Sequence, residues 1–129
     1  MKNLIWFLSF LIISNFAFCQ SEKTLVSNFN IEVGELYLLV DGERKINYWD
    51  SDKVKIIFSI ETNQSKEVLN VLTNSGRYTL ENYDKSGIKV VTMPNIQKEI
   101  IIRGSKIVEK FSFEIFLPRH VKMLEMLPL

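Results

Sequence analysis

The stretch VKIIFSIET, residues 54–62, carries the pattern that decides the fold. A large apolar side chain stands at every second position, namely Val54, Ile56, Phe58 and Ile60. The positions between them are polar except for Ile57. A period of two is typical of a β-strand that buries one face and exposes the other. The stretch therefore predicts a strand in a half-buried sheet.

The stretch FSFEIFL, residues 111–117, repeats this alternation near the other end of the chain. Pro118 follows it directly, and proline lacks the N–H that a strand ladder needs, so we expect the strand to end there. The two alternating stretches predict that Phe58 and Phe113 are core residues on separate strands.

Turn residues separate further strands from these two. LYLLV (36–40) and INYW (46–49) flank Asp41-Gly42-Glu43, and an Asp-Gly pair favours the positive φ angles of a tight hairpin. Asp50-Ser51-Asp52 then leads into VKIIFSIET, and Asp side chains in turns bond to nearby backbone amides. We expect these three strands to pair in sequence order, as a meander.

Two more hairpins and one helix complete the pattern. RYTLENY and IKVVTM flank residues 84–87, and EIIIR and IVEKFSFEIFL flank Gly104-Ser105. SKEVLNVL has helical spacing, with Ser65 as its N-cap and Gly76 as a stop. The predicted fold is mainly β: antiparallel hairpins or a meander form a sheet or sandwich, or the start of a β-solenoid, with one short helix over about residues 65–73.

The first residues have the layout of a secretory signal peptide. One lysine precedes an apolar run over residues 4–13, which is shorter than the about 20 residues of a membrane-spanning helix. Small side chains at Ala17 and Cys19 favour cleavage between Cys19 and Gln20. Bulky Phe18 disfavours the alternative, which is lipid attachment at Cys19. An uncleaved anchor and a buried helix are the remaining alternatives.

We expect residues 1–19 to be removed, residues 20–28 to be a mobile lead-in and residues 29–129 to form a single β-rich domain. One of the 16 basic residues leaves with the leader, which balances basic and acidic residues at 15 each. A neutral chain lacks the basic stripe of nucleic-acid-binding proteins. Because Cys19 is the only cysteine, the expected mature domain has neither a disulfide nor a thiolate site.

Few polar residues are candidates for a catalytic or metal-binding site. His120 is the only histidine and cannot form a usual zinc site alone, so we expect it at the surface. Asp50 and Asp52 could bind calcium, but no further ligands follow them, and a capped turn is favoured. Asn63-Gln64-Ser65 matches a glycosylation acceptor. No nucleophile elbow or phosphate loop is present, so the sequence predicts no enzyme and no catalytic, cofactor-binding or metal-binding residue.

Aromatic residues are the candidates for partner contact. Tyr37, Tyr48 and Trp49 could form a platform for sugar rings, although aromatic side chains also pair across strands for structural reasons. Tyr48 and Trp49 stand beside an expected turn, so they are the predicted glycan or partner contacts.

The stretch GELYLLVDGERKINYWDSDKVKIIFSIET, residues 34–62, resembles the N-terminal part of the putative-adhesin, β-strand-repeat envelope proteins of Gram-negative bacteria, whose heads are of the auto-transporter adhesin type. The matching positions are Ile46, Trp49, Asp50, Val54 and Ile56. The resemblance implies a signal peptide, an adhesin-like role without catalysis, and a strand that enters a repeat region after a proline. This chain reaches EMLPL at that point, so the resemblance implies a copy truncated before the repeats, or an N-terminal module alone.

We therefore expect an exported, non-catalytic, adhesin-like envelope or cell-surface module that contacts protein or glycan in the periplasm, at the outer-membrane surface or outside the cell. The alternative is a periplasmic small-ligand or sugar-binding protein in which Tyr48 and Trp49 cover a pocket. A hydrolase is a weaker alternative because no nucleophile–base pair is visible. We expect no cofactor, no nucleic acid and no stable membrane span after cleavage.

The C-terminal residues predict a further contact. Val121 begins the stretch VKMLEMLPL, which has no glycine for another turn. Its apolar side chains have no obvious cover; they are Met123, Leu124, Met126 and Leu127. An exposed apolar strand edge invites pairing with another chain, so we expect self-association through this edge.

Overall fold

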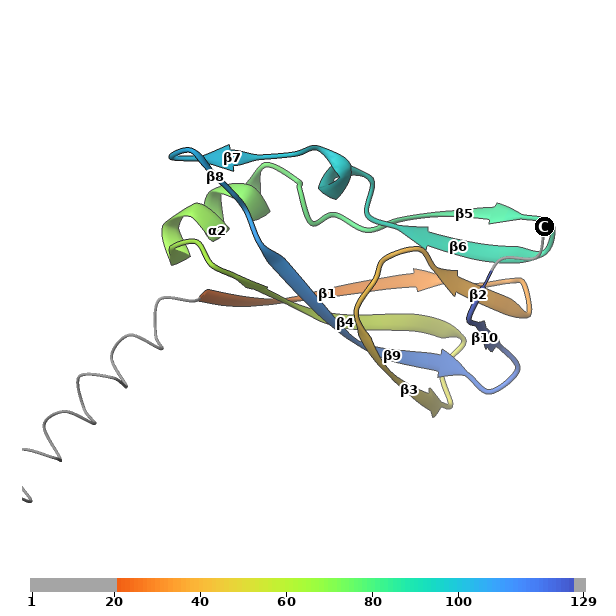
Figure 1. Ribbon diagram of the computed structural model, residues 1–129. Helices are drawn as coiled ribbons and strands as arrows, with labels where there is room; N and C mark the ends of the chain where they lie inside the picture. Colours follow the sequence, from red (N-terminus) through yellow and green to blue (C-terminus); the bar gives the residue numbers. More distant parts are fainter. Residues whose placement is uncertain (1–20, 127–129) are drawn as a thin grey trace, which may run out of the picture.

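Two four-stranded sheets pack against each other in the computed structural model, which describes residues 21–126 (Figure 1). Sheet A comprises β1 (Ser21–Asn30), β4 (Lys53–Thr62), β9 (Glu109–Pro118) and β3 (Glu43–Trp49), in that spatial order. Sheet B comprises β10 (Lys122–Leu124), β2 (Glu35–Leu38), β6 (Ile88–Thr92) and β5 (Glu81–Lys85). The remaining elements are the helix α2 (Lys66–Asn74), the 3-10 helix η1 (Pro94–Gln97) and the strands β7 (Ile101–Ile102) and β8 (Ser105–Lys106).

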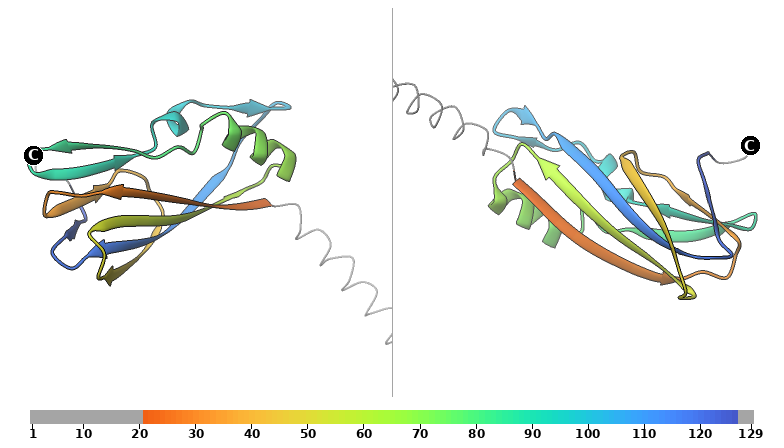
Figure 2. Two further views of the ribbon diagram at one scale, coloured as in Figure 1. Left: turned by 180° about the vertical axis from the view of Figure 1, so that it is seen from behind. Right: turned by 90° about the horizontal axis from the view of Figure 1, so that it is seen from below.

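The prediction of a mainly β fold with one short α-helix is confirmed. The described sheets form a sandwich, not successive coils of a β-solenoid (Figure 2). The predicted core residues are also confirmed, because Phe58 and Phe113 are each only 3% exposed. They lie opposite each other on β4 and β9, with ring centroids 5.9 Å apart. Alternate residues of these two strands thus form the central layer of the core.

The predicted meander is wrong, because β9 lies between β3 and β4. Strand β9 pairs antiparallel with β4 and parallel with β3. The turn over residues 50–52 therefore connects two strands that are not hydrogen-bonded neighbours. Strand β9 is long and apolar, and it buries more side-chain area between β3 and β4 than at the edge of the sheet. This burial contributes more to the stability of strand pairing than the short loop that connects β3 to β4.

The predicted hairpin at Asp41-Gly42-Glu43 is also wrong, because this segment carries the chain from sheet B to sheet A. A Cβ atom at Gly42 would lie 2.5 Å from the carbonyl oxygen of Phe111, so the glycine permits a close approach to β9. Arg44 Nη2 donates hydrogen bonds to the carbonyl oxygens of Leu38, at 2.9 Å, and Val40, at 2.7 Å. The guanidinium satisfies backbone groups that a hairpin would have paired.

The expected mobile lead-in is instead strand β1, which pairs with β4 along its whole length. Leu25 and Phe29 on its inner side pack against the core, while Glu22, Thr24 and Asn28 are exposed on the other side. The segment is polar because an edge strand buries only one face, and a polar outer face is compatible with a strand.

The remaining local predictions are confirmed, one of them only in part. Strands β5 and β6 form a hairpin whose turn residues, Ser86 and Gly87, have φ angles of 52° and 80°. The second expected hairpin is confirmed only in part: β7 and β8 pair over two residues each around Arg103 and Gly104, whereas the long strand that was expected as its second arm, β9, pairs with β4 and β3. In α2, the Ser65 hydroxyl accepts a hydrogen bond from the backbone N–H of Val68.

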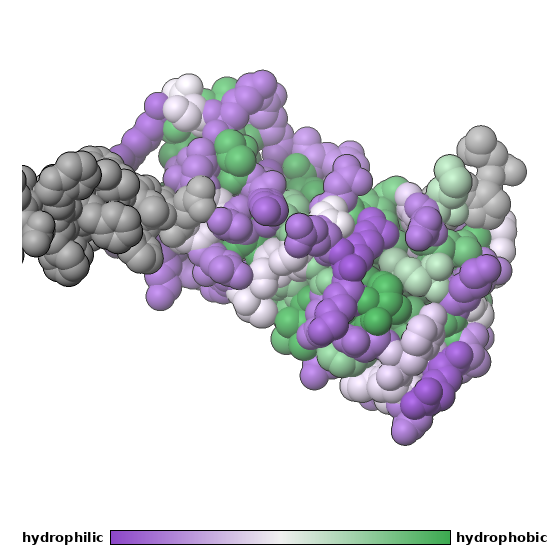
Figure 3. Space-filling model, turned by 60° about the horizontal axis from the view of Figure 1, so that its bottom comes forward, coloured by the Kyte–Doolittle hydropathy of each residue, from purple (hydrophilic) through white to green (hydrophobic). Residues whose placement is uncertain are grey.

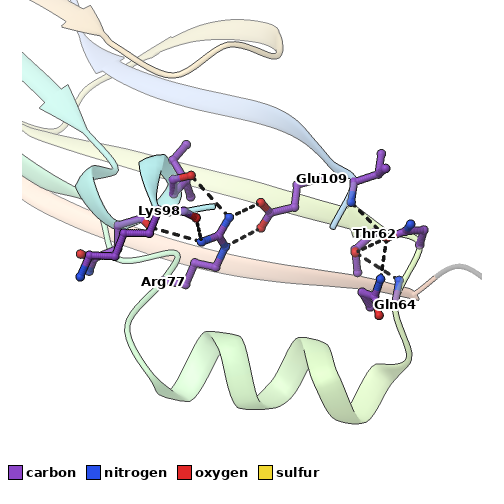
Figure 4. Close-up of polar contacts among 9 residues, drawn as sticks. Thr62, Gln64, Arg77, Lys98 and Glu109 are labelled. Carbon is purple, nitrogen blue, oxygen red and sulfur yellow. Dashed lines mark hydrogen bonds and ion pairs between the residues drawn. The ribbon is translucent and has the colours of Figure 1, made fainter. Parts of the chain in front are cut away.

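A buried ion pair attaches the end of α2 to β9 (Figure 4). Arg77 donates from Nη2 to Glu109 Oε1 at 2.6 Å and from Nε to Oε2 at 3.0 Å. The same guanidinium donates to backbone carbonyls in and after η1, including Lys98 O at 2.9 Å. Hydrogen bonding to Glu109 raises the pKa of Arg77. Because Arg77 is 5% exposed, these contacts fix the position of the chain that leads to β7.

The C-terminal residues are better covered than expected. Val121 is buried, and β10 pairs parallel with β2 at the edge of sheet B. Met123 packs against the core, whereas Met126 is 76% exposed, as the sequence predicted. Leu127 lies outside the described residues, as do the expected leader and the predicted cleavage between Cys19 and Gln20.

Candidate functional site

Trp49, Asp50 and His120, for which the sequence predicts different roles, line one shallow depression. It lies where β3 and β9 end and β4 begins, and it has a volume of about 270 Å³. Its lining residues are Trp49, Asp50, Ser51, Asp52, Pro118, Arg119 and His120. The parallel pairing of β3 with β9 places Trp49 opposite Pro118, which brings residues 49–52 to residues 118–120. The depression therefore depends on a contact between distant parts of the chain.

Trp49 forms the aromatic wall of the depression. Its indole Nε1 donates to the carbonyl oxygen of Lys53 at 2.8 Å, which fixes the ring orientation. The ring lies 5.4 Å from the ring of Phe116 at an interplanar angle of 44°. Lys55 Nζ stands 5.8 Å from the centre of the Phe116 ring, within the range of a cation–π contact. The indole is thus held on a rigid strand end rather than on a mobile loop.

The opposite side of the depression is charged. Arg119 Nε donates to Asp50 Oδ1 at 2.9 Å, and both side chains are largely exposed. An ion pair in solvent contributes little to stability, typically about 0–1 kcal/mol, so these groups keep most of their capacity to bind polar partners. His120 is exposed, as expected for a surface residue.

The turn itself is capped by a different residue than expected. The Ser51 hydroxyl accepts a hydrogen bond from the backbone N–H of Lys53 at 3.2 Å, whereas Asp50 reaches across to Arg119. Within residues 21–126, no group of three or more His, Cys, Asp or Glu side chains is placed to hold a metal ion. The depression offers an aromatic ring, carboxylates, a guanidinium and an imidazole, which suit binding of polar groups through hydrogen bonds and stacking.

The three aromatic candidates do not form a single platform. Tyr48 and Trp49 are consecutive strand residues, so their side chains leave β3 on opposite faces. Tyr48 is 50% exposed, but it does not line the depression. Tyr37 lies in sheet B, opposite Val90 of β6, which in turn lies opposite Tyr83 of β5. Tyr37 therefore belongs to a cross-strand row, whereas Trp49 is the aromatic side chain placed for contact.

The outer face of sheet A adds residues that the sequence analysis did not select. Phe116 and Ile57 occupy outward positions on β9 and β4, in stretches that otherwise alternate with polar residues. Figure 3 shows this face, where hydrophobic side chains interrupt a mostly hydrophilic surface. A large apolar residue at a polar position of the alternation is the signal that could have identified Phe116. Arg119 had no such signal, because its partner Asp50 is distant in sequence.

A second cavity of about 280 Å³ opens between β1 and the segment that follows α2. It is lined by hydroxyl-bearing residues and by apolar ones; they are Ser27, Thr73, Tyr78 and Thr79, and Leu25, Val26, Phe58 and Leu80. A mixed lining of this kind can accommodate a small amphipathic molecule.

Comparisons with known proteins return one distant likeness. No protein-family model matches the chain, and no curated protein matches it. Among solved structures, the chain is similar to a putative adhesin from Parabacteroides merdae ATCC 43184, with 17% sequence identity and a TM-score of 0.30. The match covers 78% of this chain and 35% of the adhesin, so the chain spans about a third of the length of that protein.

None of the helices in the described part of the chain has the length and apolar character needed to traverse a bilayer.

Proposed function

We propose that the protein is an exported, non-catalytic binding module of the adhesin-like type, which contacts a protein or glycan at the cell envelope or cell surface through the depression around Trp49. The observation that supports this proposal is the convergence of an oriented indole, the Asp50–Arg119 pair and His120 at one exposed end of the sandwich. Aromatic and arginine side chains are the residues that most often dominate binding surfaces. Planar sugar faces can stack on the indole while hydroxyl groups bond to the charged side.

Replacement of Trp49 tests the proposal. Exported protein is screened against glycans and envelope proteins, and Trp49→Ala and Arg119→Ala are compared with the parent. We expect Trp49→Ala to weaken binding by about 2 kcal/mol, roughly 30-fold, because the ring is the main contact surface. Tyr48→Ala is the matched control, since the neighbouring side chain lies on the other face of β3.

The same binding experiment tests the absence of catalysis. A binding module releases its ligand unchanged, which mass spectrometry of the recovered glycan or protein measures. Equal binding by Trp49→Ala and the parent would assign recognition to another surface, and a chemically altered ligand would assign an enzymatic role.

The alternative function, a periplasmic small-ligand or sugar-binding protein, is favoured by the second cavity beside Tyr78. Fluorescence distinguishes the two functions. Once the leader with Trp6 is removed, Trp49 is the only tryptophan. Soluble sugars or lipids that bind the second cavity should bind the parent and Trp49→Phe equally, whereas ligands of the depression should change the Trp49 emission.

A further inference from the structure

The end of the sandwich opposite the depression exposes apolar side chains. Val71 on α2, Ile101 on β7 and Val108 before β9 are 66%, 62% and 61% exposed, more than any other large apolar residue of the described chain except Met126. The backbone N–H of Val108 donates to Asn63 Oδ1, which places Val108 beside the start of α2. We call this surface the α2–β7 end (Figure 1).

An apolar groove joins the helix to the hairpin at this end. It has a volume of about 470 Å³ and is lined by Glu67, Val68, Val71, Leu72, Ile100 and Ile102. Exposed apolar surfaces that adjoin such a groove mark contacts with a protein or a membrane.

The charges around the groove favour an anionic partner. In residues 65–75 and 98–108 the basic side chains are Lys66, Lys98, Arg103 and Lys106, and the acidic ones are Glu67 and Glu99. Lys106 Nζ lies 3.0 Å from Glu99 Oε1, so these two charges offset each other and leave Lys66, Lys98 and Arg103 against Glu67. Two copies of this basic surface would repel each other in a symmetric dimer, which disfavours a second copy as the occupant.

The N-terminal end of strand β1 lies at this same end of the molecule. Ser21 begins β1 beside α2, where its hydroxyl donates to the carbonyl oxygen of Gln64 at 2.6 Å, and Lys23 Nζ donates to Asn70 Oδ1 at 3.0 Å. The N-terminal end of the described chain therefore lies at the α2–β7 end, so an anchor that precedes Ser21 would be attached on the side of the proposed membrane contact.

We propose that the α2–β7 end docks peripherally on the surface of an anionic membrane. Ile101, Val71 and Val108 enter the interface between headgroups and acyl chains, while Lys98 and Arg103 contact the headgroups. Apolar burial and attraction to anionic lipid are the two contributions that hold peripheral proteins on bilayers. The depression at Trp49 then faces away from the membrane, since it lies at the other end of sheet A (Figure 1). This docking does not depend on the proposed function of the depression.

Vesicle flotation tests the proposal with exported protein whose N-terminus has been determined by mass spectrometry. Vesicles of phosphatidylcholine alone are compared with vesicles that also contain phosphatidylglycerol. We expect the parent to float only with the anionic vesicles and to be released by salt. Arg103→Asn removes one charge and keeps a residue that tolerates the positive φ of the turn, and it should reduce partitioning about fivefold. Ile101→Asp should reduce it about tenfold or more.

Val26→Asp is the matched control, because Val26 is a similarly exposed strand residue, at 56%, on β1. It should float like the parent. If thermal unfolding shows that Ile101→Asp disrupts the fold, Val71→Asp replaces it. The proposal is overturned if the parent floats with neither vesicle, if Ile101→Asp and Val26→Asp lose binding equally, or if binding to neutral vesicles persists in every variant. A dimer that forms without vesicles and is dissociated by Ile101→Asp would also overturn it and assign the surface to a second copy.

Discussion

At the scale of single residues, Phe58 and Phe113 connect neighbouring strands through one stacked pair in the core. We expect Phe58→Ala to lower the free energy of unfolding by about 3–5 kcal/mol, because a cavity replaces a ring that is 3% exposed. Denaturant titration measures this loss as a lower midpoint. The double variant with Phe113→Ala should lose less than the sum of the single losses, since the two rings share contacts. A midpoint equal to that of the parent for Phe58→Ala would refute the assignment of this residue to the core.

The hydroxyl group of Tyr78 is expected to destabilise the folded state. It is 2% exposed, and within residues 21–126 its hydroxyl has no hydrogen-bond partner. Burial, and then the nearby Glu109 carboxylate, raise the pKa of Tyr78. We expect Tyr78→Phe to raise the free energy of unfolding at neutral pH by about 1 kcal/mol, because the unsatisfied hydroxyl is removed and the ring is kept.

The same substitution should change stability in alkaline solution. A phenol that ionises less readily when folded than when unfolded loses stability as the pH rises above its unfolded pKa of about 10. The parent should therefore lose stability above this pH more steeply than Tyr78→Phe, with Tyr48→Phe as an exposed control. Parallel stability profiles for parent and variant would contradict this origin of the alkaline loss.

At the scale of elements, the connection from β2 to β3 depends on Gly42. A Cβ atom there would meet the backbone of β9 at Phe111, so Gly42→Ala should cost about 2–3 kcal/mol through displaced strands. Gly34→Ala is the control, since its nearest contact would be an ordinary 3.9 Å to the carbonyl oxygen of His120. Circular dichroism during thermal unfolding compares the two. Equal stability of both variants would mean that the crossover can shift without cost.

Elements defined by local patterns could be predicted from the sequence, and elements defined by distant pairing could not. Helix α2 follows from its Ser65 N-cap and its apolar residues at helical spacing, and the β5–β6 hairpin follows from the Ser86-Gly87 turn. All of these signals act within a few residues. The position of β3 beside β9 has no local signal, because the alternation of a strand does not name its partner. The Asp-Gly signal was misleading since glycine serves close packing as well as turns. The candidate site shares this limit. Trp49 was predicted as a contact, but Asp50 and His120 were predicted only as turn and surface residues, because their position beside Trp49 depends on the β3–β9 register.

At the scale of the whole molecule, the two ends of the chain carry separate predictions. We expect the exported protein to begin at Gln20 and to lack Cys19, because Ala17 and Cys19 are small and Phe18 is bulky. N-terminal sequencing or intact mass measurement checks this. A lipid-modified Cys19 would replace a cleaved leader by a permanent anchor at the α2–β7 end.

We expect the C-terminal end of the described chain to mediate self-association. Strand β10 is the outer strand of sheet B, and Met126 beyond it is 76% exposed. A chain that ends at Glu125 keeps β10 and removes this apolar surface, so it should be more soluble and should unfold at the same midpoint as the parent. Sedimentation velocity measures the association state. A parent that stays monomeric at high concentration would remove the basis of this prediction.

The insertion of β9 between β3 and β4 also dictates when the protein can fold. In the described part of the chain, strand β3 has no partner in sheet A except β9, so this half of the sheet stays open until residues 109–118 are available. Pairing between segments so far apart in sequence is slow, because the intervening chain must be closed into a loop before the contacts form. A chain that emerges with its N-terminus first, from a ribosome or from an export channel, cannot complete this core before β9 has emerged. The topology thus keeps the core incomplete until β9 has emerged, so the exported chain proposed above would cross the membrane unfolded up to that point.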